Sequence, residues 1–496
     1  MNLLKKQGFY NSITLYIGTA LGFFNLIILF QRVLTAEQIG FFALMSSAIT
    51  LLYTQIAAIG YSSVITRFFP FFKSDDKKHH GFPTYVFKVT AIGFLIVTAF
   101  YVFGKEYILD FKSAAKGSSY FFKYYYLIVP VALFTLWYNL AETFARTTFH
   151  NILPSFLREV FLKVLTTVAV LLVYFGWIDY QGFVYWYVGA NALILLILLL
   201  YLKRLDLLRF KATQPAVKEK SPEILKYGLY SMLAGGSFAL IQNIDVILLK
   251  VYTTEQNVGY YYTMFAIAMV ISLPAKALNT TSYQIIADAW KTDDLQKINK
   301  IYKKTSLVQF IIGCLLLIGL IANWQNILVM LKKPEYVNYY SVFVVVAIGF
   351  LFDITGGLNG AIISFSKKYK LVMYILVSAA ALCAFLNVLF IPKYGMLGAA
   401  LAYSLTMFAL NFTYWAFLTF KYKLQPFNFT YIKVVLMGFL VLTLGIYIPY
   451  LNNFFVDVII RSGLMSLVYV GLIFTFKISP DINEAILQVI NKVKTK

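Results

Sequence analysis

Six charged side chains lie within or at the ends of long apolar stretches of the chain. An ionised side chain at the centre of a bilayer costs about 2.5–3.5 kcal/mol on insertion scales, so such charges commonly serve a function. The basic ones could compensate an anion, and they are Lys276, Arg67 and Arg146. The acidic ones could bind a cation or a proton, and they are Asp245, Asp353 and Glu142. These six residues are the candidate binding groups.

Most of these charges also have a purely structural interpretation. Glu142 and Arg146 are four residues apart, so on a helix they can neutralise one another. Arg67 ends an apolar run and could anchor it at the membrane surface. Asp245 and Asp353 could each satisfy a buried lysine or backbone groups. The sequence alone leaves both interpretations open for these residues.

Lys276 is the hardest of the candidates to explain by structure alone. It follows the helix-bending Pro274 and lies about midway along a long predicted span. Its amino group is therefore too far from either surface to reach water easily. We expect Lys276 to face a cleft.

The sequence carries no motif of a metal, nucleotide or hydrolase site. Its three histidines lie in polar connections, and its two cysteines lie in apolar stretches without a CxxC pair. No HExxH, Walker loop or GxSxG pattern occurs. We therefore expect a transporter rather than an enzyme, with no resident cofactor, and leave open whether a metal binds.

The elements that must position these charges are membrane-spanning helices. The chain is 60% hydrophobic and 13% charged, against roughly 45–50% and about 25% in soluble domains. Apolar runs of about 20 residues can cross the hydrocarbon core as helices. The pattern predicts an all-α polytopic membrane protein with fourteen transmembrane helices. These lie near 11–31, 39–66, 84–104, 120–144, 158–177, 182–202, 224–249, 258–287, 305–322, 339–364, 371–391, 397–420, 431–450 and 457–476.

The distribution of positive charge indicates the orientation. The formal net charge is +22, but basic residues scattered between apolar runs do not form the clustered surface of a nucleic-acid-binding protein. If the amino terminus is cytoplasmic, most Lys and Arg residues fall in cytoplasmic connections, as the positive-inside rule requires. We predict a multi-pass protein of the inner (cytoplasmic) cell membrane with both termini cytoplasmic. Membrane lipids are expected partners and nucleic acids are not.

A repeated loop divides the chain into two pseudo-symmetric halves. RVLTAEQIGFF at 32–42 returns as KVYTTEQNVGYY at 250–261 if Asn257 is treated as an insertion, and KQGFYNS at 6–12 matches KYGLYSM at 226–232. An even number of helices per repeat gives both copies the same orientation, related by an axis along the membrane normal. The predicted parts are two six-helix bundles, a cytoplasmic linker, two additional helices and a cytoplasmic tail. The bundles span 1–203 and 224–424, the linker spans 204–223, the two additional helices span 425–478, and the tail spans 479–496.

The segment IPKYGMLGAALAYSL at 391–405 predicts a tight connection between two closely packed helices. Pro392 is expected to end the first helix, because proline lacks the backbone N–H that a helix interior needs. Gly395 permits a tight turn, and Gly398, Ala399 and Ala400 let the second helix approach a neighbour closely.

The chain resembles the multidrug/oligosaccharidyl-lipid/polysaccharide exporter (MOP) superfamily. The likeness rests on the paired loop, on GYSSVITRFFP at 60–70 and on the 391–405 segment, and it covers roughly residues 5–476. Within the superfamily the chain is most similar to the polysaccharide branch, the Wzx-like flippases of undecaprenyl-pyrophosphate-linked oligosaccharides.

This resemblance implies a flippase that carries a lipid-linked oligosaccharide from the cytoplasmic to the external leaflet by alternating access, for surface polysaccharide biosynthesis. The three basic candidates would bind the pyrophosphate, and the three acidic candidates would bind a coupling Na⁺ or H⁺. Other polysaccharide assembly proteins are further candidate partners. One alternative is a cation-coupled multidrug or metabolite antiporter of the same superfamily. An alternative from another class is a membrane-embedded glycan polymerase or acyltransferase.

Overall fold

The computed structural model describes residues 2–74, 79–106, 120–484 and 487–488. Every regular element in these ranges is an α, 3-10 or π helix, which confirms the predicted all-α class. The internal contacts divide the chain into two units, Met1–Tyr262 and Thr263–Lys496. The predicted limits of the bundles, linker and tail stay predictions.

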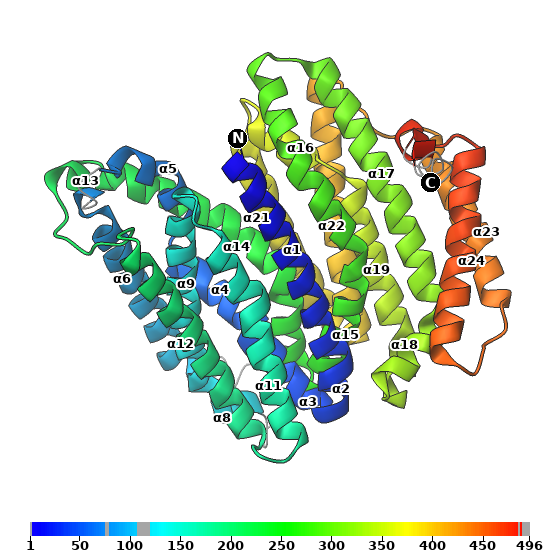
Figure 1. The fold of residues 1–496 in the computed structure, drawn as a ribbon, viewed down its shortest axis with the longest axis horizontal. Helices are drawn as coiled ribbons and strands as arrows, with labels where there is room; N and C mark the ends of the chain where they lie inside the picture. The colour runs from blue at the N-terminus through cyan, green and yellow to red at the C-terminus, as the bar shows by residue number, and fades with distance from the viewer. Residues whose placement is uncertain (1, 75–78, 107–119, 485–486, 489–496) are drawn as a thin grey trace. The chain divides into compact units, whose positions relative to one another are not determined.

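The first unit contains the elements from α1 to the beginning of α15 (Figure 1). They are α1 (Asn2–Phe23), η1 (Phe24–Leu29), α2 (Phe30–Val33), α3 (Ala36–Ala43), η2 (Leu44–Ala48), α4 (Ile49–Ala57), α5 (Tyr61–Phe72), η3 (His79–Gly81), α6 (Phe82–Phe103), α8 (Tyr120–Tyr124), η4 (Tyr125–Leu127), α9 (Ile128–Thr147), α10 (Ile152–Phe156), η5 (Leu157–Phe161), α11 (Leu162–Tyr174), α12 (Tyr180–Arg204), α13 (Pro215–Glu219), α14 (Ser221–Tyr252) and α15 (Glu255–Ala268).

The second unit contains the remaining elements, up to the C-terminal hairpin of α23 and α24. They are η6 (Met269–Ser272), α16 (Leu273–Lys291), α17 (Leu295–Ala322), α18 (Trp324–Leu331), η7 (Pro334–Tyr339), α19 (Tyr340–Thr355), α20 (Asn359–Phe365), α21 (Lys370–Tyr394), α22 (Met396–Tyr422), α23 (Thr430–Tyr447) and α24 (Phe454–Thr475).

Thirteen helices of the described chain are long and apolar enough to cross a membrane, so this is a multi-pass membrane protein. All predicted spans except 158–177 overlap one of them. In that stretch α10, η5 and α11 follow one another without a break, but Arg158, Glu159 and Lys163 interrupt the apolar run. The predicted count of fourteen is therefore not confirmed.

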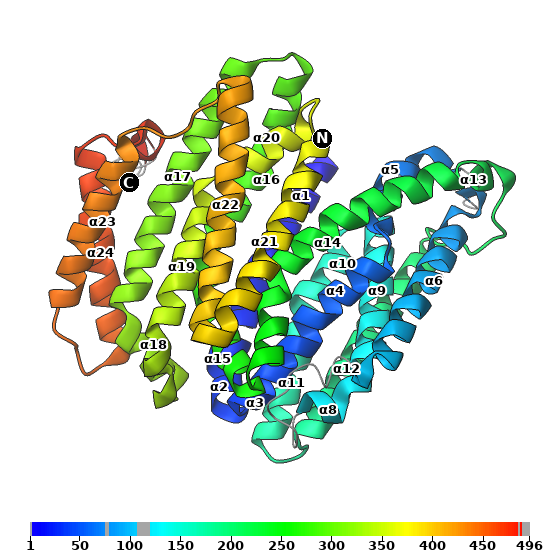
Figure 2. The ribbon, with the colours of Figure 1, turned by 180° about the vertical axis from the view of Figure 1, so that it is seen from behind.

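Helices α5, α9 and α14 come together in the first unit. Helix α5 contacts both α9 and α14, and α4 also packs on α9 and α14 (Figure 2). Phe69 of α5 meets Phe144 of α9 edge to face, with 5.1 Å between ring centroids. Both rings are almost completely buried. This aromatic contact fixes the position of α5 relative to α9.

The turn between α21 and α22 in the second unit is as tight as the sequence predicts. Gly395 has φ +57°, a left-handed conformation that glycine adopts without strain. A Cβ on Gly398 would lie 2.3 Å from the carbonyl oxygen of Phe390, so the two helices approach closely here. The prediction for Pro392 is wrong, because α21 continues to Tyr394. Near the end of a helix, proline removes one hydrogen bond without preventing the last turn.

The two copies of the repeated loop both belong to the first unit. Thr35 precedes α3, where its Oγ1 accepts a hydrogen bond from the Gln38 N–H in a capping box. Thr254 precedes α15, and its Oγ1 accepts from the Asn257 N–H. The loops therefore align at Thr35 and Thr254 without a gap. The predicted insertion at Asn257 is wrong, and the extra residue lies before the cap.

The first turns of α3 and α15, which correspond to each other in this alignment, are in direct backbone contact. A Cβ on Gly40 would lie 2.0 Å from the carbonyl oxygen of Glu255. A Cβ on Gly259 would lie 1.9 Å from the carbonyl oxygen of Ala36. Only glycine permits such an approach from both sides. The repeated glycine is therefore the point where the two copies touch.

The two copies differ in chemistry one residue after the cap, where Glu255 replaces Ala36. The Glu255 carboxylate is buried and accepts the backbone N–H groups of Tyr120 and Phe121 at the start of α8. It also forms an ion pair with Lys250 at 3.2 Å. Glu255 thus joins α14, α15 and α8, a role that the first copy cannot repeat.

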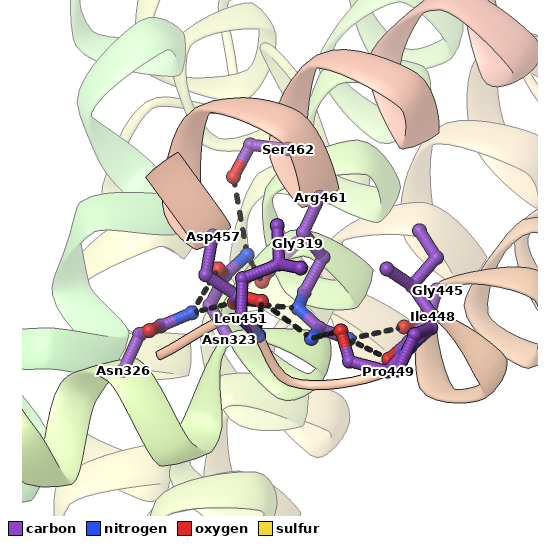
Figure 3. A network of polar contacts seen from close by, with 10 residues as sticks. All are labelled: Gly319, Asn323, Asn326, Gly445, Ile448, Pro449, Leu451, Asp457, Arg461 and Ser462. Carbon is purple, nitrogen blue, oxygen red and sulfur yellow. Dashed lines mark hydrogen bonds and ion pairs between the residues drawn. The ribbon is translucent and has the colours of Figure 1, made fainter. Parts of the chain in front are cut away.

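A buried ion pair holds the hairpin of α23 and α24 in the second unit (Figure 3). Arg461 donates two hydrogen bonds to the carboxylate of Asp457, from Nε at 3.0 Å and from Nη2 at 2.9 Å. The same carboxylate accepts the Leu451 N–H and the side-chain amide of Asn326 on α18. The pair therefore links α24 to α18 and to the connection that precedes α24.

The guanidinium of Arg461 also satisfies the end of α23. Its Nη1 donates to the carbonyl oxygens of Gly445 at 2.6 Å and Ile448 at 3.1 Å. These are carbonyls that the end of a helix leaves without an intrahelical donor. We did not predict Asp457 and Arg461 from the sequence, although their i, i+4 spacing within the last span was the available signal.

Candidate anion-binding site

A cavity of about 370 Å³ opens between α5, α9 and α14 in the first unit. It contains two of the three predicted basic candidates. Its lining residues are Ser62, Ser63, Thr66, Arg67, Thr143, Arg146 and Tyr227. The cavity therefore offers two guanidinium groups, several hydroxyls and one phenol to an occupant.

The sequence of α5 explains how one helix can serve both the core and the cavity. Its buried side chains recur with helical spacing and form an apolar face. The residues that line the cavity occupy the intervening positions. The buried set is Tyr61, Val64, Ile65, Phe68, Phe69 and Phe72.

Arg67 is held in the cavity by aromatic rings. Its guanidinium carbon lies 4.5 Å from the ring centroid of Tyr227 and 5.5 Å from that of Phe68. Stacking on a ring face leaves the N–H groups at the edge of the guanidinium plane available for hydrogen bonds. In the described chain Arg67 has no ion-pair partner. Its donors can therefore receive an anion.

Glu142 does not pair with Arg146, so the structural interpretation of these two residues is not met. Glu142 instead forms an ion pair with Arg158, with 3.0 Å between Oε2 and Nη1. Arg158 comes from η5, and its second terminal nitrogen donates to the side-chain oxygen of Asn139. Arg146 makes no ion pair with any described residue. Its side chain is exposed and lines the cavity.

Lys276, the third basic candidate, belongs to the second unit. It lies in the first turns of α16, just after the 3-10 turn η6, and its side chain is exposed. It is close enough to Asp353 on α19 for the two charges to interact. Lys276 is not among the residues that line the cavity of Arg67 and Arg146.

Asp353 is partly buried in a group of amide side chains. The side-chain amide of Asn411 on α22 interacts with its carboxylate. The side-chain oxygen of Asn411 in turn accepts from Asn359 at 2.8 Å. Asp353 therefore lies close to an amide group and to one cation, the exposed Lys276, rather than to the buried lysine or backbone groups of its structural interpretation.

Asp245 is buried in the first unit, with 1% of its surface exposed. The hydroxyl of Tyr261 on α15 donates to one carboxylate oxygen, and the Val246 N–H donates to the other. Both carboxylate oxygens of Asp245 are therefore hydrogen-bonded inside the helix bundle.

Sequence reasoning missed several residues that shape the site. Tyr227 falls in the repeated KYGLYSM segment, and that repetition was the only signal for it. Arg158 was assigned to a helix end and given no role. In the described chain no group of three His, Cys, Asp or Glu side chains could hold a metal ion.

The comparisons with known proteins agree with this fold. The family described as "Polysaccharide biosynthesis protein" matches residues 4–290. The lipid II flippase MurJ, in its inward closed conformation, is similar with a TM-score of 0.77 and 15% identity, covering 95% of this chain and 99% of that chain. An inward-facing multidrug resistance MATE family transporter of the MOP superfamily is similar with a TM-score of 0.63 and 14% identity, covering 89% of this chain and 100% of that chain.

A curated relative covers a shorter region. The uncharacterized membrane protein MJ1068 of Methanocaldococcus jannaschii is 24% identical over 255 residues, which are 50% of this chain and 49% of that protein. The match spans about half the length of this relative. The similarity to MurJ and to the MATE transporter supports the architecture along almost the whole chain.

Proposed function

The chain belongs to the polysaccharide biosynthesis protein family, and we propose that it flips a lipid-linked oligosaccharide, with an undecaprenyl pyrophosphate carrier, from the cytoplasmic to the external leaflet. Its fold is that of flippases and transporters of the MOP superfamily, as the sequence resemblance indicated. The proposed transport proceeds by alternating access and supplies surface polysaccharide biosynthesis. The observation that carries the proposal is the cavity lined by two arginines, neither of which has an ion-pair partner among the residues that the structure describes.

The chemistry of the cavity suits a diphosphate. A pyrophosphate that enters a region of low dielectric constant needs positive charge close by. The guanidinium groups of Arg67 and Arg146 match phosphate oxygens in geometry and can bind them through two parallel hydrogen bonds each. The hydroxyls of Ser62, Thr66 and neighbouring side chains can donate to oxygens that the arginines do not reach.

The remaining parts of the proposal concern the setting of this site. We place the protein in the inner membrane with both termini cytoplasmic, from the distribution of basic residues. Na⁺ or H⁺ is proposed as the coupling ion, with Asp245 and Asp353 as its candidate sites. Glu142 is a weaker candidate for this role, because Arg158 already neutralises its charge.

Loss of the two arginines is expected to abolish export of surface polysaccharide. Each charge-assisted hydrogen bond to a charged group contributes about 1.5–3 kcal/mol, so Arg67→Gln or Arg146→Gln should weaken pyrophosphate binding about 10- to 100-fold. The double variant should export none. Surface polysaccharide would be measured in the native host, and binding of undecaprenyl pyrophosphate would be measured with purified protein.

Arg209→Gln is the matched control, because Arg209 is partly exposed, pairs with Asp206 and lies in the connection after α12. It should keep normal export. Normal export by the Arg67→Gln and Arg146→Gln double variant, present in the membrane at normal levels, would refute the proposal. Drug resistance on overexpression, with no effect on polysaccharide, would instead favour the antiporter alternative.

A further inference from the structure

We infer that Arg158 is a positioning residue that keeps Arg146 available for the anion by holding Glu142 away from it. The inference rests on the proposed function, since it concerns the same cavity. It assigns a role in substrate binding to a charge that does not line the cavity itself.

Two cations, Arg146 on α9 and Arg158 on η5, compete for the carboxylate of Glu142. Glu142 and Arg146 are four residues apart on α9, a spacing at which side chains on a helix are neighbours. Without another partner, Glu142 would be the natural counter-ion of Arg146. Arg158 from η5 occupies the Glu142 carboxylate at 3.0 Å instead.

Several contacts fix Arg158 in this position. Its guanidinium donates to Asn139, one turn before Glu142 on the same helix. Its central carbon lies 4.6 Å from the ring centroid of Tyr138. The Tyr138 hydroxyl in turn donates to the carbonyl oxygen of Pro154 at 2.6 Å. Arg158 is thus held by an ion pair, a hydrogen bond and a ring face at once.

One side of α9 is consequently divided between two tasks. Asn139 and Glu142 face Arg158, whereas Thr143 and Arg146 line the cavity. The Glu142 side chain is 14% exposed and that of Arg158 is 32% exposed, so solvent screens the pair only in part. A partly buried Glu142 that lost Arg158 would need another cation, and Arg146 is the neighbouring cation on its own helix.

The η5 segment gives Arg158 its place. The chain forms a π turn from Leu157 to Phe161, in the middle of the continuous helix from α10 to α11. Single π turns within α-helices change the direction of the side chains around them and are frequent at functional sites. Arg158 is the second residue of this turn.

The test is a set of variants of the full-length protein in detergent, with inorganic pyrophosphate as the probe in isothermal titration calorimetry. Arg158→Gln is expected to weaken binding about tenfold, because the released Glu142 would neutralise Arg146. Glu142→Gln should bind about two- to threefold more tightly, because a nearby negative charge is removed. The Arg158→Gln, Glu142→Gln double variant should recover binding to within about threefold of the unmodified protein.

Two further variants test whether Arg158 acts by neutralising Glu142 or only by supporting the local structure. Arg158→Lys retains a cation for Glu142 and should bind pyrophosphate nearly normally. Lys163→Gln breaks the neighbouring Lys163–Glu159 pair, which joins a cation of similar exposure to its carboxylate at 3.1 Å, and should not alter binding. Failure of the double variant to recover binding would overturn the inference, since the inference attributes the loss in Arg158→Gln to the negative charge of Glu142.

Arg146→Gln distinguishes failure of the inference from failure of the proposed function. If this variant binds pyrophosphate normally, the cavity is not an anion site, and both the inference and the support for the proposed function are lost. If Arg146→Gln weakens binding but Arg158→Gln does not, only the positioning role of Arg158 is refuted.

Discussion

Replacement of Arg461 by methionine is expected to lower the free energy of unfolding by about 3–5 kcal/mol, because removing one partner of a buried ion pair leaves an uncompensated charge. Asp457 is 0% exposed and Arg461 is 5% exposed, so water cannot take over the lost contacts. The variant would also leave the carbonyl oxygens of Gly445 and Ile448 without their donor. Denaturant unfolding of the detergent-solubilised protein measures the loss.

Two comparisons test the physical reason for this effect. The double variant Arg461→Met with Asp457→Leu should regain most of the lost stability, because replacing a whole buried pair by apolar side chains is often close to neutral. Lys291→Ala breaks a pair with Asp288 whose side chains are 73% and 49% exposed, and exposed pairs contribute only about 0–1 kcal/mol. Equal effects of Arg461→Met and Lys291→Ala would contradict the argument.

Substitution of Gly259 by alanine is expected to disrupt the contact between the two repeated loops. The new methyl group would lie 1.9 Å from the carbonyl oxygen of Ala36, and a backbone atom cannot turn aside as the end of a side chain can. Overpacking of this kind costs about 1–3 kcal/mol and occasionally more. The same unfolding measurement should show a clear loss of stability. Gly40→Ala should behave alike, since its methyl group would meet the Glu255 carbonyl.

Gly236→Ala is the control for this prediction. Apart from the adjoining residues and the backbone of its own helix, no heavy atom of the described chain lies within 4 Å of the position that its Cβ would take. Alanine is also favoured over glycine in a helix by about 1 kcal/mol, so this variant should be as stable as the original or slightly more stable. If Gly259→Ala matched Gly236→Ala in stability, the close contact between the loops would be refuted.

The membrane helices could be predicted well because their signal is local. Hydropathy and length depend only on the residues of one segment, and thus all predicted spans but one coincide with helices suited to the membrane. The exception, 158–177, contains three charges, of which Arg158 pairs with Glu142 on another helix and Glu159 pairs with Lys163. Pro392 shows a similar limit, since proline is a strong signal but does not decide on its own where a helix ends.

The candidate site could be predicted only in part. Arg67 and Arg146 were recognised as charges that need an explanation, and both line one cavity. The ring partner of Arg67 and the ion-pair partner of Glu142 could not be predicted, because Tyr227 and Arg158 come from helices whose packing is not encoded by spacing along α5 or α9.

By itself the sequence determined that this chain crosses the membrane repeatedly as helices and that the loop at 32–42 recurs at 250–261. It also determined that a few charged residues lie within apolar stretches, where charges are costly. Each of these follows from the composition or order of a single stretch of residues. The tertiary structure alone decided which partner each charge has. The i, i+4 spacing makes Glu142 and Arg146 neighbours on one helix. Helix packing nevertheless brings Arg158 to 3.0 Å from the carboxylate of Glu142. An ion pair forms with the nearest suitably oriented charge in space, and only the packed helices determine which one that is.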